Sequence, residues 1–408
     1  MTLPAMTQSP LPADSGDWPT SRPFALLTED EAMRILQDGS LNVYKLPQGK
    51  DMAKRFAAAV NAAIVNIRAQ LIASGSYTEA TAPLQQPAGS RSVAPGVALS
   101  PETLEAVEWG FAKIPRVYKL AVVGGCCGGK TKSRELIGEA LQKAQQVQTF
   151  GTPEIATVLF DQGAMSNGSY HGFVNEEYIE FVIQSEILQF VMEGIWAQGA
   201  ALSTSSSYAV LMTDRDALDG KAYSRPLAPW APVSWSRILD ETGKRIHIPG
   251  LTESDLVRRY EIGAVFWHSL ARIHGKLDAV AYDRECQKPT RHESAQEAFE
   301  NDRNASQAYE EAYPGDHIIW LQSMHHGAIK PKLHEIVHFV ERRLGAGDDD
   351  DSPELFSTAS EVQPWLATLV LVSSAMILWL ALRFPVSRRE LARSAWLPPV
   401  DEPLLVPR

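Results

Sequence analysis

Apolar residues recur at steps of three and four along much of this chain, which is the pattern of helices with one buried face. In residues 51–74, for example, Phe56, Val60 and Ile64 would lie on one face. The same periodicity predicts further helices at 28–37, 101–114, 133–146, 176–198, 253–275, 293–312 and 331–344. The chain is therefore predicted to be mainly α-helical.

Three short runs have the character of β-strands instead. Residues 117–123, 155–160 and 208–212 are apolar and rich in β-branched side chains. They leave open an α/β fold in which a small central parallel sheet lies among the helices.

Composition along the chain predicts the domain organisation. Residues 1–24 are rich in Pro, Ser, Thr and Asp and are expected to form a disordered N-terminal tail. A helical N-terminal region at 25–76 is followed by a loop or linker at 77–99, which is rich in Pro, Gly, Ser and Gln. The main soluble domain is expected at 100–344.

The longest uncharged apolar run lies near the C-terminus. Residues 365–382 would span about 27 Å as a helix, which is close to the thickness of a bilayer core. An acidic linker at 345–364 precedes the run, and a basic tail at 383–408 follows it. The pattern predicts a single transmembrane helix, with a buried core helix as the alternative for so short a run.

Two signals disagree about the orientation of this span. The basic residues after it would place the tail in the cytosol and the main domain outside. The N-terminus, however, lacks the basic start and apolar stretch of a secretory signal. We therefore expect a tail anchor that is inserted after translation, with the soluble domain in the cytosol.

The charge and the cysteines narrow the function classes. A formal net charge of -11 and a pI near 5.5 argue against a broad basic face for nucleic acid. The three cysteines cannot build a disulfide framework, because Cys126 and Cys127 are neighbours and only Cys286 is distant. A reducing compartment is the simpler interpretation.

A phosphate-binding motif follows the first predicted strand. The sequence from Gly124 to Thr131 matches G-x-x-x-x-G-K-[ST], and a helix is predicted directly after it. In such a loop the glycines turn backbone N–H groups toward phosphate oxygens. Lys130 would reach the terminal phosphates and Thr131 would bind magnesium, with Gly124 and Gly129 framing the loop. The alternative is a Gly-rich turn before an amphipathic helix.

The stretch from Tyr118 through Gly124 to Lys130 and Thr131 resembles the first strand and phosphate loop of Ras-type small GTPases. The resemblance covers a small part of the chain. It implies that Asp161 is the switch aspartate near magnesium and that Asp216 reads the nucleotide base.

A second motif is typical of zinc peptidases. His334-Glu335-x-x-His338 matches H-E-x-x-H, in which two histidines on one helical face bind zinc and the glutamate activates a water molecule. No third ligand stands at a familiar spacing, so zinc is not expected as a cofactor. The alternative is a solvated amphipathic helix.

A third hypothesis is a helical RNA-packaging protein. Residues 231–239 and 259–267 are similar to the core of flexible filamentous viral coat proteins. Under that resemblance, RNA phosphates would contact basic side chains at Lys130, Lys132, Arg134, Arg258 and Arg259.

The leading hypothesis is a tail-anchored protein whose soluble domain binds ATP or GTP with magnesium. Its alternatives are a helical RNA-binding coat-type protein, a membrane-anchored zinc metallopeptidase and a non-catalytic helical scaffold. The sequence leaves open whether the protein is an enzyme.

The membrane anchor is directly testable. Deletion of residues 365–408 should release the protein from membranes, because the apolar run is expected to be the segment that spans the bilayer. Sedimentation after a carbonate wash compares the truncated and full-length chains. A truncated protein that still sediments with membranes contradicts the anchor.

Overall fold

The structure is a computed structural model that describes residues 24–38, 41, 43–75, 84–86, 98–145, 147–164, 175–224, 234–286 and 294–345. The chain divides into two compact units, Met1–Ala346 and Gly347–Arg408, and every described residue belongs to the first. The predicted span at 365–382 and basic tail at 383–408 lie outside the described residues, as do residues 1–23 of the N-terminal tail.

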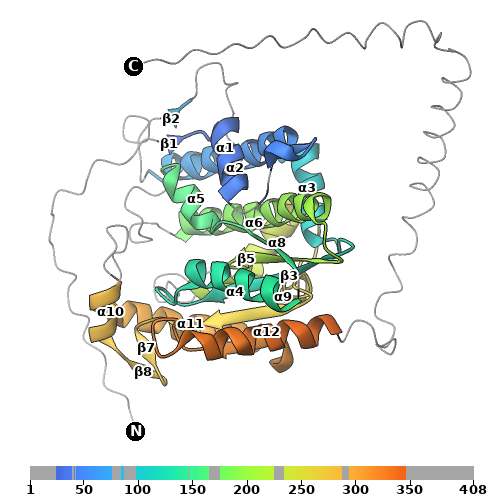
Figure 1. The fold of residues 1–408 in the computed structure, drawn as a ribbon. Coiled ribbons are helices and arrows are strands. Elements are labelled where there is room, and N and C mark those ends of the chain that lie inside the picture. The colour runs from blue at the N-terminus through green and yellow to red at the C-terminus, as the bar shows by residue number, and fades with distance from the viewer. Residues whose placement is uncertain are drawn as a thin grey trace, which may run out of the picture. The chain divides into compact units, whose positions relative to one another are not determined.

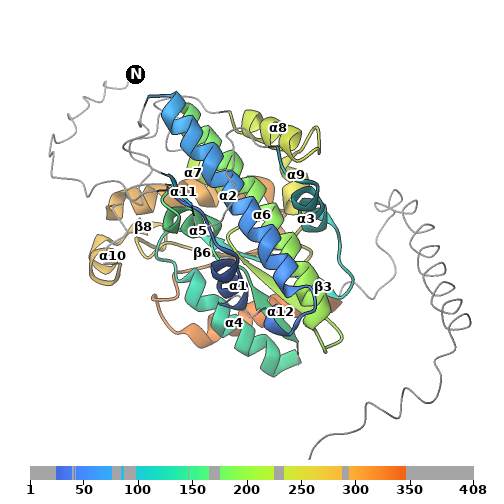
Figure 2. The same ribbon diagram turned by 90° about the horizontal axis from the view of Figure 1, so that it is seen from above.

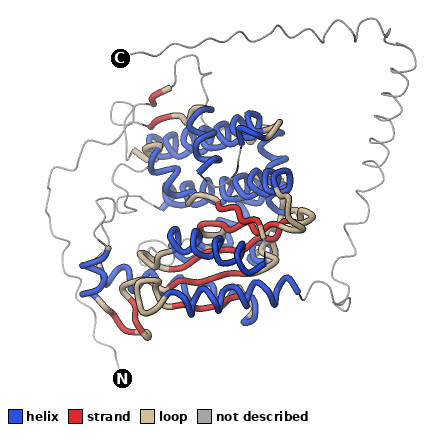
Figure 3. The backbone as a smooth tube through the Cα atoms, viewed as in Figure 1, coloured by secondary structure: helices blue, strands red, loops and turns tan. Residues whose placement is uncertain are grey.

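The described part of the chain is mostly helical and contains a small parallel sheet, as the sequence predicts (Figure 3). The sheet has the strand order β4-β5-β3-β6-β9, and all four neighbouring pairs are parallel. Its strands are β3 (Val117–Gly124), β4 (Gln148–Gly151), β5 (Ala209–Asp214), β6 (Gly263–Trp267) and β9 (Ile318–Leu321). The first strand in sequence, β3, is thus the central one.

The helices before, between and after these strands are numbered α1 to α12. They are α1 (Glu29–Asp38), α2 (Gly49–Ala73), α3 (Pro101–Phe111), α4 (Lys130–Gln145), α5 (Ile155–Asp161), α6 (Asn175–Ser203), α7 (Asp219–Ser224), α8 (Trp235–Arg245), α9 (Glu253–Val257), α10 (Ala279–Glu285), α11 (Ala295–Ala312) and α12 (Ile329–Gly345). Two-residue pairs β1–β2 (Phe24–Ala25 with Leu84–Gln85) and β7–β8 (Arg272–Ile273 with Lys276–Leu277) complete the fold.

Both faces of the sheet are covered by helices, as a parallel sheet requires. Successive side chains of β3 alternate between the faces. Leu120 and Val122 pack with Ile137 of α4 and with α12 on one side. Ala121 and Val123 belong to the larger core that α6 and α11 form on the other side. The sheet is therefore the middle layer of an α/β/α sandwich.

An additional helical layer lies beyond α6. Figure 1 shows α6 between the sheet and α1–α2, and Figure 2 shows α2 running alongside α6. Phe56 of α2 meets Trp196 of α6 edge to face, with ring centroids 5.5 Å apart. Because α6 is covered by the sheet and by α2 and α3, it buries side chains around most of its circumference.

Among the described residues, α2 is the one helix that is long and apolar enough to cross a membrane. The run at 365–382 is therefore not the only segment with that property. Because α2 packs along α6 and buries Phe56, Val60 and Ile64, its hydrophobicity is explained by the core of the domain.

Two sequence predictions were wrong about the type of element. Residues 155–160 form helix α5, and the neighbouring strand is β4, an edge strand whose one fully buried side chain is Phe150. The predicted helix at 253–275 is short helix α9 followed by strand β6. Gly263 begins β6 with φ 109°, and a Cβ there would lie 2.1 Å from the carbonyl oxygen of His317. The backbone just before β9 thus comes too close to Gly263 for a side chain, so this first position of β6 requires glycine.

A buried ion pair joins α6 to the segment before β6. Arg259 pairs with Glu193, and Tyr260 donates to the same carboxylate over 2.6 Å. The Arg259 guanidinium also lies 4.4 Å from the centroid of the Phe190 ring. Since both charges are inside the core, removing either would leave the other uncompensated. Arg259 is therefore structural and is not available to an RNA backbone.

Candidate functional site

The candidate site begins where central strand β3 ends. The loop Gly124–Gly129 leaves the carboxyl end of β3 and leads directly into α4. From β3 the chain builds β4 and β5 on one side and then crosses to β6 and β9 on the other. In open parallel sheets, ligands bind at the carboxyl ends of the strands where the direction of winding reverses. The motif found in the sequence lies at that point.

The glycines of the loop are required by the close approach of neighbouring chain. A Cβ at Gly124 would lie 2.0 Å from the Trp267 carbonyl oxygen, and a Cβ at Gly125 would lie 2.3 Å from Asp302 Oδ1. Gly124 and Gly129 also have φ values of 123° and 94°, which favour glycine. With Cys127 at φ 52°, the loop has the left-handed turns of a backbone nest that binds anions.

Lys130 lies beneath this loop. Its ammonium donates to the carbonyl oxygens of Gly124 and Gly125, over 3.0 and 2.9 Å. Burial lowers the pKa of Lys130, and the nearby Arg215 lowers it further. The Lys130 side chain is therefore buried and is held close to the loop by these two hydrogen bonds.

Thr131 connects the loop to the neighbouring strand. Its hydroxyl donates to Asp214 Oδ2 over 3.1 Å, and Asp214 is the last residue of β5. Arg134, one turn further along α4, pairs with the same carboxylate at 3.2 Å. The polar first turn of α4 is thus explained by contacts with β5, while Ile137 is the first apolar side chain of α4 that is fully buried.

The two aspartates suggested by the Ras-type resemblance lie elsewhere. Asp161 ends α5 with an exposed side chain, because the segment that precedes it is a helix and not a strand. Asp216 is buried and accepts hydrogen bonds from the hydroxyls of Tyr309 and Tyr313. The carboxylate beside Thr131 is Asp214, which the sequence reasoning missed. The signal in the sequence that could have identified Asp214 is its place at the end of an apolar strand.

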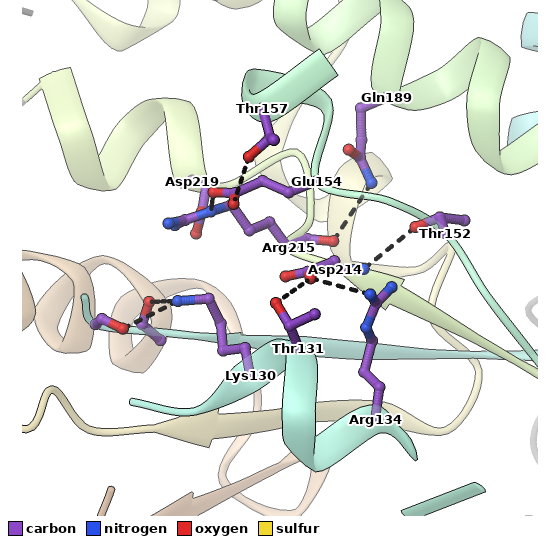
Figure 4. Close-up of polar contacts among 12 residues, drawn as sticks. Lys130, Thr131, Arg134, Thr152, Glu154, Thr157, Gln189, Asp214, Arg215 and Asp219 are labelled. Atoms are coloured by element: carbon purple, nitrogen blue, oxygen red, sulfur yellow. Dashed lines mark hydrogen bonds and ion pairs between the residues drawn. The ribbon is translucent and has the colours of Figure 1, made fainter. Parts of the chain in front are cut away.

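Arg215 and Glu154 form an ion pair next to Asp214 (Figure 4). Glu154 follows β4, and Arg215 follows β5 and also pairs with Asp219. Burial alone would raise the pKa of Glu154, but Arg215 and Lys130 together hold it at about 2. Glu154 is therefore a carboxylate at neutral pH, and it stands between the loop and the space beneath α6.

That space is a cavity between α5, α6 and the start of α7. It measures about 510 Å³, including the part that is open to solvent. Its apolar wall contains Ile155, Tyr178, Phe181 and Val182, and its polar wall contains Glu186, Gln189, Arg215, Asp216 and Asp219. Arg215 lines the cavity, and its partner Glu154 directly precedes Ile155 of the cavity wall.

Glu186 has the position of a ligand contact in the cavity. Its Oε2 atom is buried and has no hydrogen-bond partner among the described residues. Burial raises the pKa of Glu186 well above its usual range, and the neighbouring Asp216 raises it further. A protonated Glu186 can both donate and accept a hydrogen bond, so it suits a polar group on a bound molecule.

The residues of the zinc motif lie on the exposed face of α12. His334, Glu335 and His338 are all exposed, and the Nε2 atoms of the two histidines are 3.0 Å apart. Within the part of the chain that the structure describes, no group of three His, Cys, Asp or Glu side chains is placed to hold a metal. The helix itself is the one predicted from the sequence.

The chain matches no known family model, and no curated protein matches it by sequence. The interpretation of the site therefore depends on the geometry of this chain.

Asp216 predicts a pH dependence of stability. Burial, and then repulsion by Asp219, raises the pKa of Asp216 from 3.8 to about 7. The folded state thus binds the proton more tightly than the unfolded chain, and stability should fall as pH rises from about 4 to about 7. Asp216→Asn should remove roughly 3 kcal/mol of the loss between pH 5 and 8.

Urea unfolding at pH 5 and pH 8 measures this difference. The control is Asp38→Asn, since Asp38 is exposed at the end of α1. Equal pH slopes in the wild type and in Asp216→Asn would mean that Asp216 is ionised in the folded protein at both pH values.

Proposed function

We propose that this chain is a membrane-anchored P-loop protein that binds ATP or GTP with magnesium at Gly124–Thr131 and transfers the terminal phosphoryl group to a small hydroxyl-bearing molecule. The observation that carries the proposal is the contact of Thr131 with Asp214. It places a hydroxyl and a carboxylate side by side at the end of the phosphate-binding nest.

The donor set fits magnesium. Mg²⁺ prefers oxygen ligands and binds proteins through one or two of them, together with water and substrate phosphates. Thr131 is accessible to solvent, and Asp214 Oδ1 is buried without a hydrogen-bond partner among the described residues. Thr131 and Asp214 would hold magnesium, which would neutralise negative charge on the phosphate groups. Arg134 balances the carboxylate of Asp214 in the structure without a ligand.

The cavity supports phosphoryl transfer over simple nucleotide binding. Catalysis of this reaction consists mainly of positioning and of electrostatic stabilisation. Lys130 and Arg215 supply positive charge next to the loop, and Glu154 is a carboxylate that can accept a hydrogen bond from an attacking hydroxyl. We place the molecule that carries this hydroxyl in the cavity that Arg215, the ion-pair partner of Glu154, lines.

The remaining parts of the proposal come from the sequence. The anchor at 365–382, which lies outside the described residues, and a cytosolic location of the soluble domain stay as predicted. The RNA-packaging alternative is weakened, since Lys130 and Arg259 are buried. The zinc alternative has no third ligand among the described residues, and we do not propose it.

Nucleotide binding should depend on Lys130. Lys130→Ala should weaken binding of a fluorescent ATP or GTP analogue at least tenfold, because a charge-assisted contact is worth about 1.5–3 kcal/mol. Lys132→Ala is the matched control, since Lys132 is exposed two residues away and pairs with Glu135. Thr131→Ala should reduce the extent to which magnesium strengthens nucleotide binding.

Thermal melts must accompany these titrations, because Lys130 is buried and its loss leaves two carbonyl groups unpaired. Thr131→Ala, which removes an exposed hydroxyl, keeps the test informative if Lys130→Ala folds poorly. Micromolar affinity corresponds to about 8 kcal/mol of binding energy, and such a site would be almost saturated at about 100 μM nucleotide. A folded wild type that binds no nucleotide at this concentration would therefore overturn the proposal.

Phosphoryl transfer should depend on Glu154. Glu154→Gln should slow ADP formation from Mg·ATP about 100-fold in the presence of an acceptor, while nucleotide affinity changes little. The assay uses a panel of ring compounds with free hydroxyls, including nucleosides and cyclic polyols. Glu176→Gln on the exposed end of α6 is the control. If no compound raises ADP formation above the rate with water, transfer is contradicted and nucleotide binding alone remains.

A further inference from the structure

The phosphate loop is covalently connected to a distant part of the chain. Cys127, in the middle of the loop, forms a disulfide with Cys286, which caps the C-terminus of α10. The two Cα atoms are 6.1 Å apart, and 159 residues separate the two cysteines in sequence. This pairing was not expected from the sequence, where three cysteines favoured a reducing compartment.

The flanking loop residues are held by non-covalent contacts. The carbonyl oxygen of Cys126 accepts from the hydroxyl of Ser269 over 2.7 Å, and that of Gly128 accepts from the backbone N–H of Met324 over 3.0 Å. Cys127 is the loop residue that is covalently joined to the end of α10. The disulfide therefore fixes the middle of the loop.

We propose that Cys127 and Cys286 form a reversible thiol–disulfide pair that sets the nucleotide affinity of the phosphate loop. This inference rests on the proposed function of that loop. The disulfide form is the one with high affinity, and the dithiol form binds more weakly.

The direction of the effect follows from the backbone. Cys127 has φ 52°, in the left-handed region that residues other than glycine adopt at a cost. In the nest this conformation helps to turn backbone N–H groups toward an anion. The disulfide holds Cys127 there, whereas a free Cys127 can relax to negative φ. In the reduced protein, a smaller fraction of molecules then keeps Cys127 in the left-handed conformation, and the nucleotide affinity is about fivefold weaker.

The chemistry balances with a low-molecular-weight disulfide as the oxidant. The Cys127 side chain is partly exposed and Cys286 is buried, so the Cys127 thiolate attacks the small disulfide first. The Cys286 thiolate then attacks the mixed disulfide. One S–S bond forms in the protein, one breaks in the oxidant, and the two electrons and two protons leave as two small thiols. A dithiol reverses the reaction.

The test uses the full-length chain in detergent, equilibrated with oxidised glutathione or with dithiothreitol. Alkylation after denaturation, read by mass spectrometry, should label Cys126 alone in the oxidised protein and all three cysteines in the reduced protein. Titration with a fluorescent ATP analogue and Mg²⁺ should then give about fivefold tighter binding to the oxidised protein. Hydrogen exchange of the peptide that contains residues 124–131 should be slower in the oxidised form.

Cys286→Ser is the matched variant, because it removes the partner cysteine without changing the loop. With dithiothreitol it should bind nucleotide like the reduced wild type, and its thermal melt checks the fold. With oxidised glutathione its Cys127 can form only the mixed disulfide, which mass spectrometry identifies. Equal affinities of oxidised and reduced wild type, tighter binding after reduction, or failure of Cys127 and Cys286 to pair would each overturn the switch alone. If neither form binds nucleotide, the proposed function fails together with the affinity effect.

Discussion

The pairing of β3 on both of its edges is the constraint on which the site depends. Hydrogen bonds to β5 and β6 fix the line of β3, and helices cover both of its faces. The loop that follows β3 therefore leaves the sheet at the carboxyl end of β3, between the end of β6 and α11. Trp267 and Asp302 approach so closely there that a side chain at Gly124 or Gly125 would collide with them. The same glycines that fit this gap also give the loop its anion-binding shape.

The charges around the loop are already arranged in the structure without ligands. Lys130 is held by two loop carbonyls, Arg134 by Asp214, and Arg215 by Glu154 and Asp219. Groups that are fixed in this way need little reorganisation when a charged substrate arrives, and such preorganisation is a main source of electrostatic catalysis. Under the proposed function, two of the carboxylates that hold these cations, Asp214 and Glu154, would also contact magnesium and an attacking hydroxyl.

The sequence predicted the parts of this site that are contiguous. The strand at 117–123 was found from its apolar, β-branched residues, the loop from its motif, and the following helix from its periodicity. Asp214 was missed because the Ras-type resemblance pointed to Asp216 instead. The strand predicted at 208–212 ends at Asp214 in the structure. Glu154 was missed because the edge strand before it carries one buried side chain and so has a weak pattern. Residues that meet through the sheet register leave no periodic signal in the chain.

The carboxyl groups in the cavity restrict the acceptor under the proposed function. Glu186, Asp216 and Asp219 all line the cavity, and burial raises the pKa of the first two. Tyrosine hydroxyls satisfy Asp216 and Asp219, which leaves Glu186 as the group facing a bound molecule. An anionic acceptor would have to leave water for a partly apolar space in which these carboxyl groups supply no compensating positive charge, and burying an unpaired charge is costly. The cavity therefore suits a neutral or cationic acceptor, whereas the negative charge of the nucleotide is met by Lys130 and the loop on the other side of Glu154.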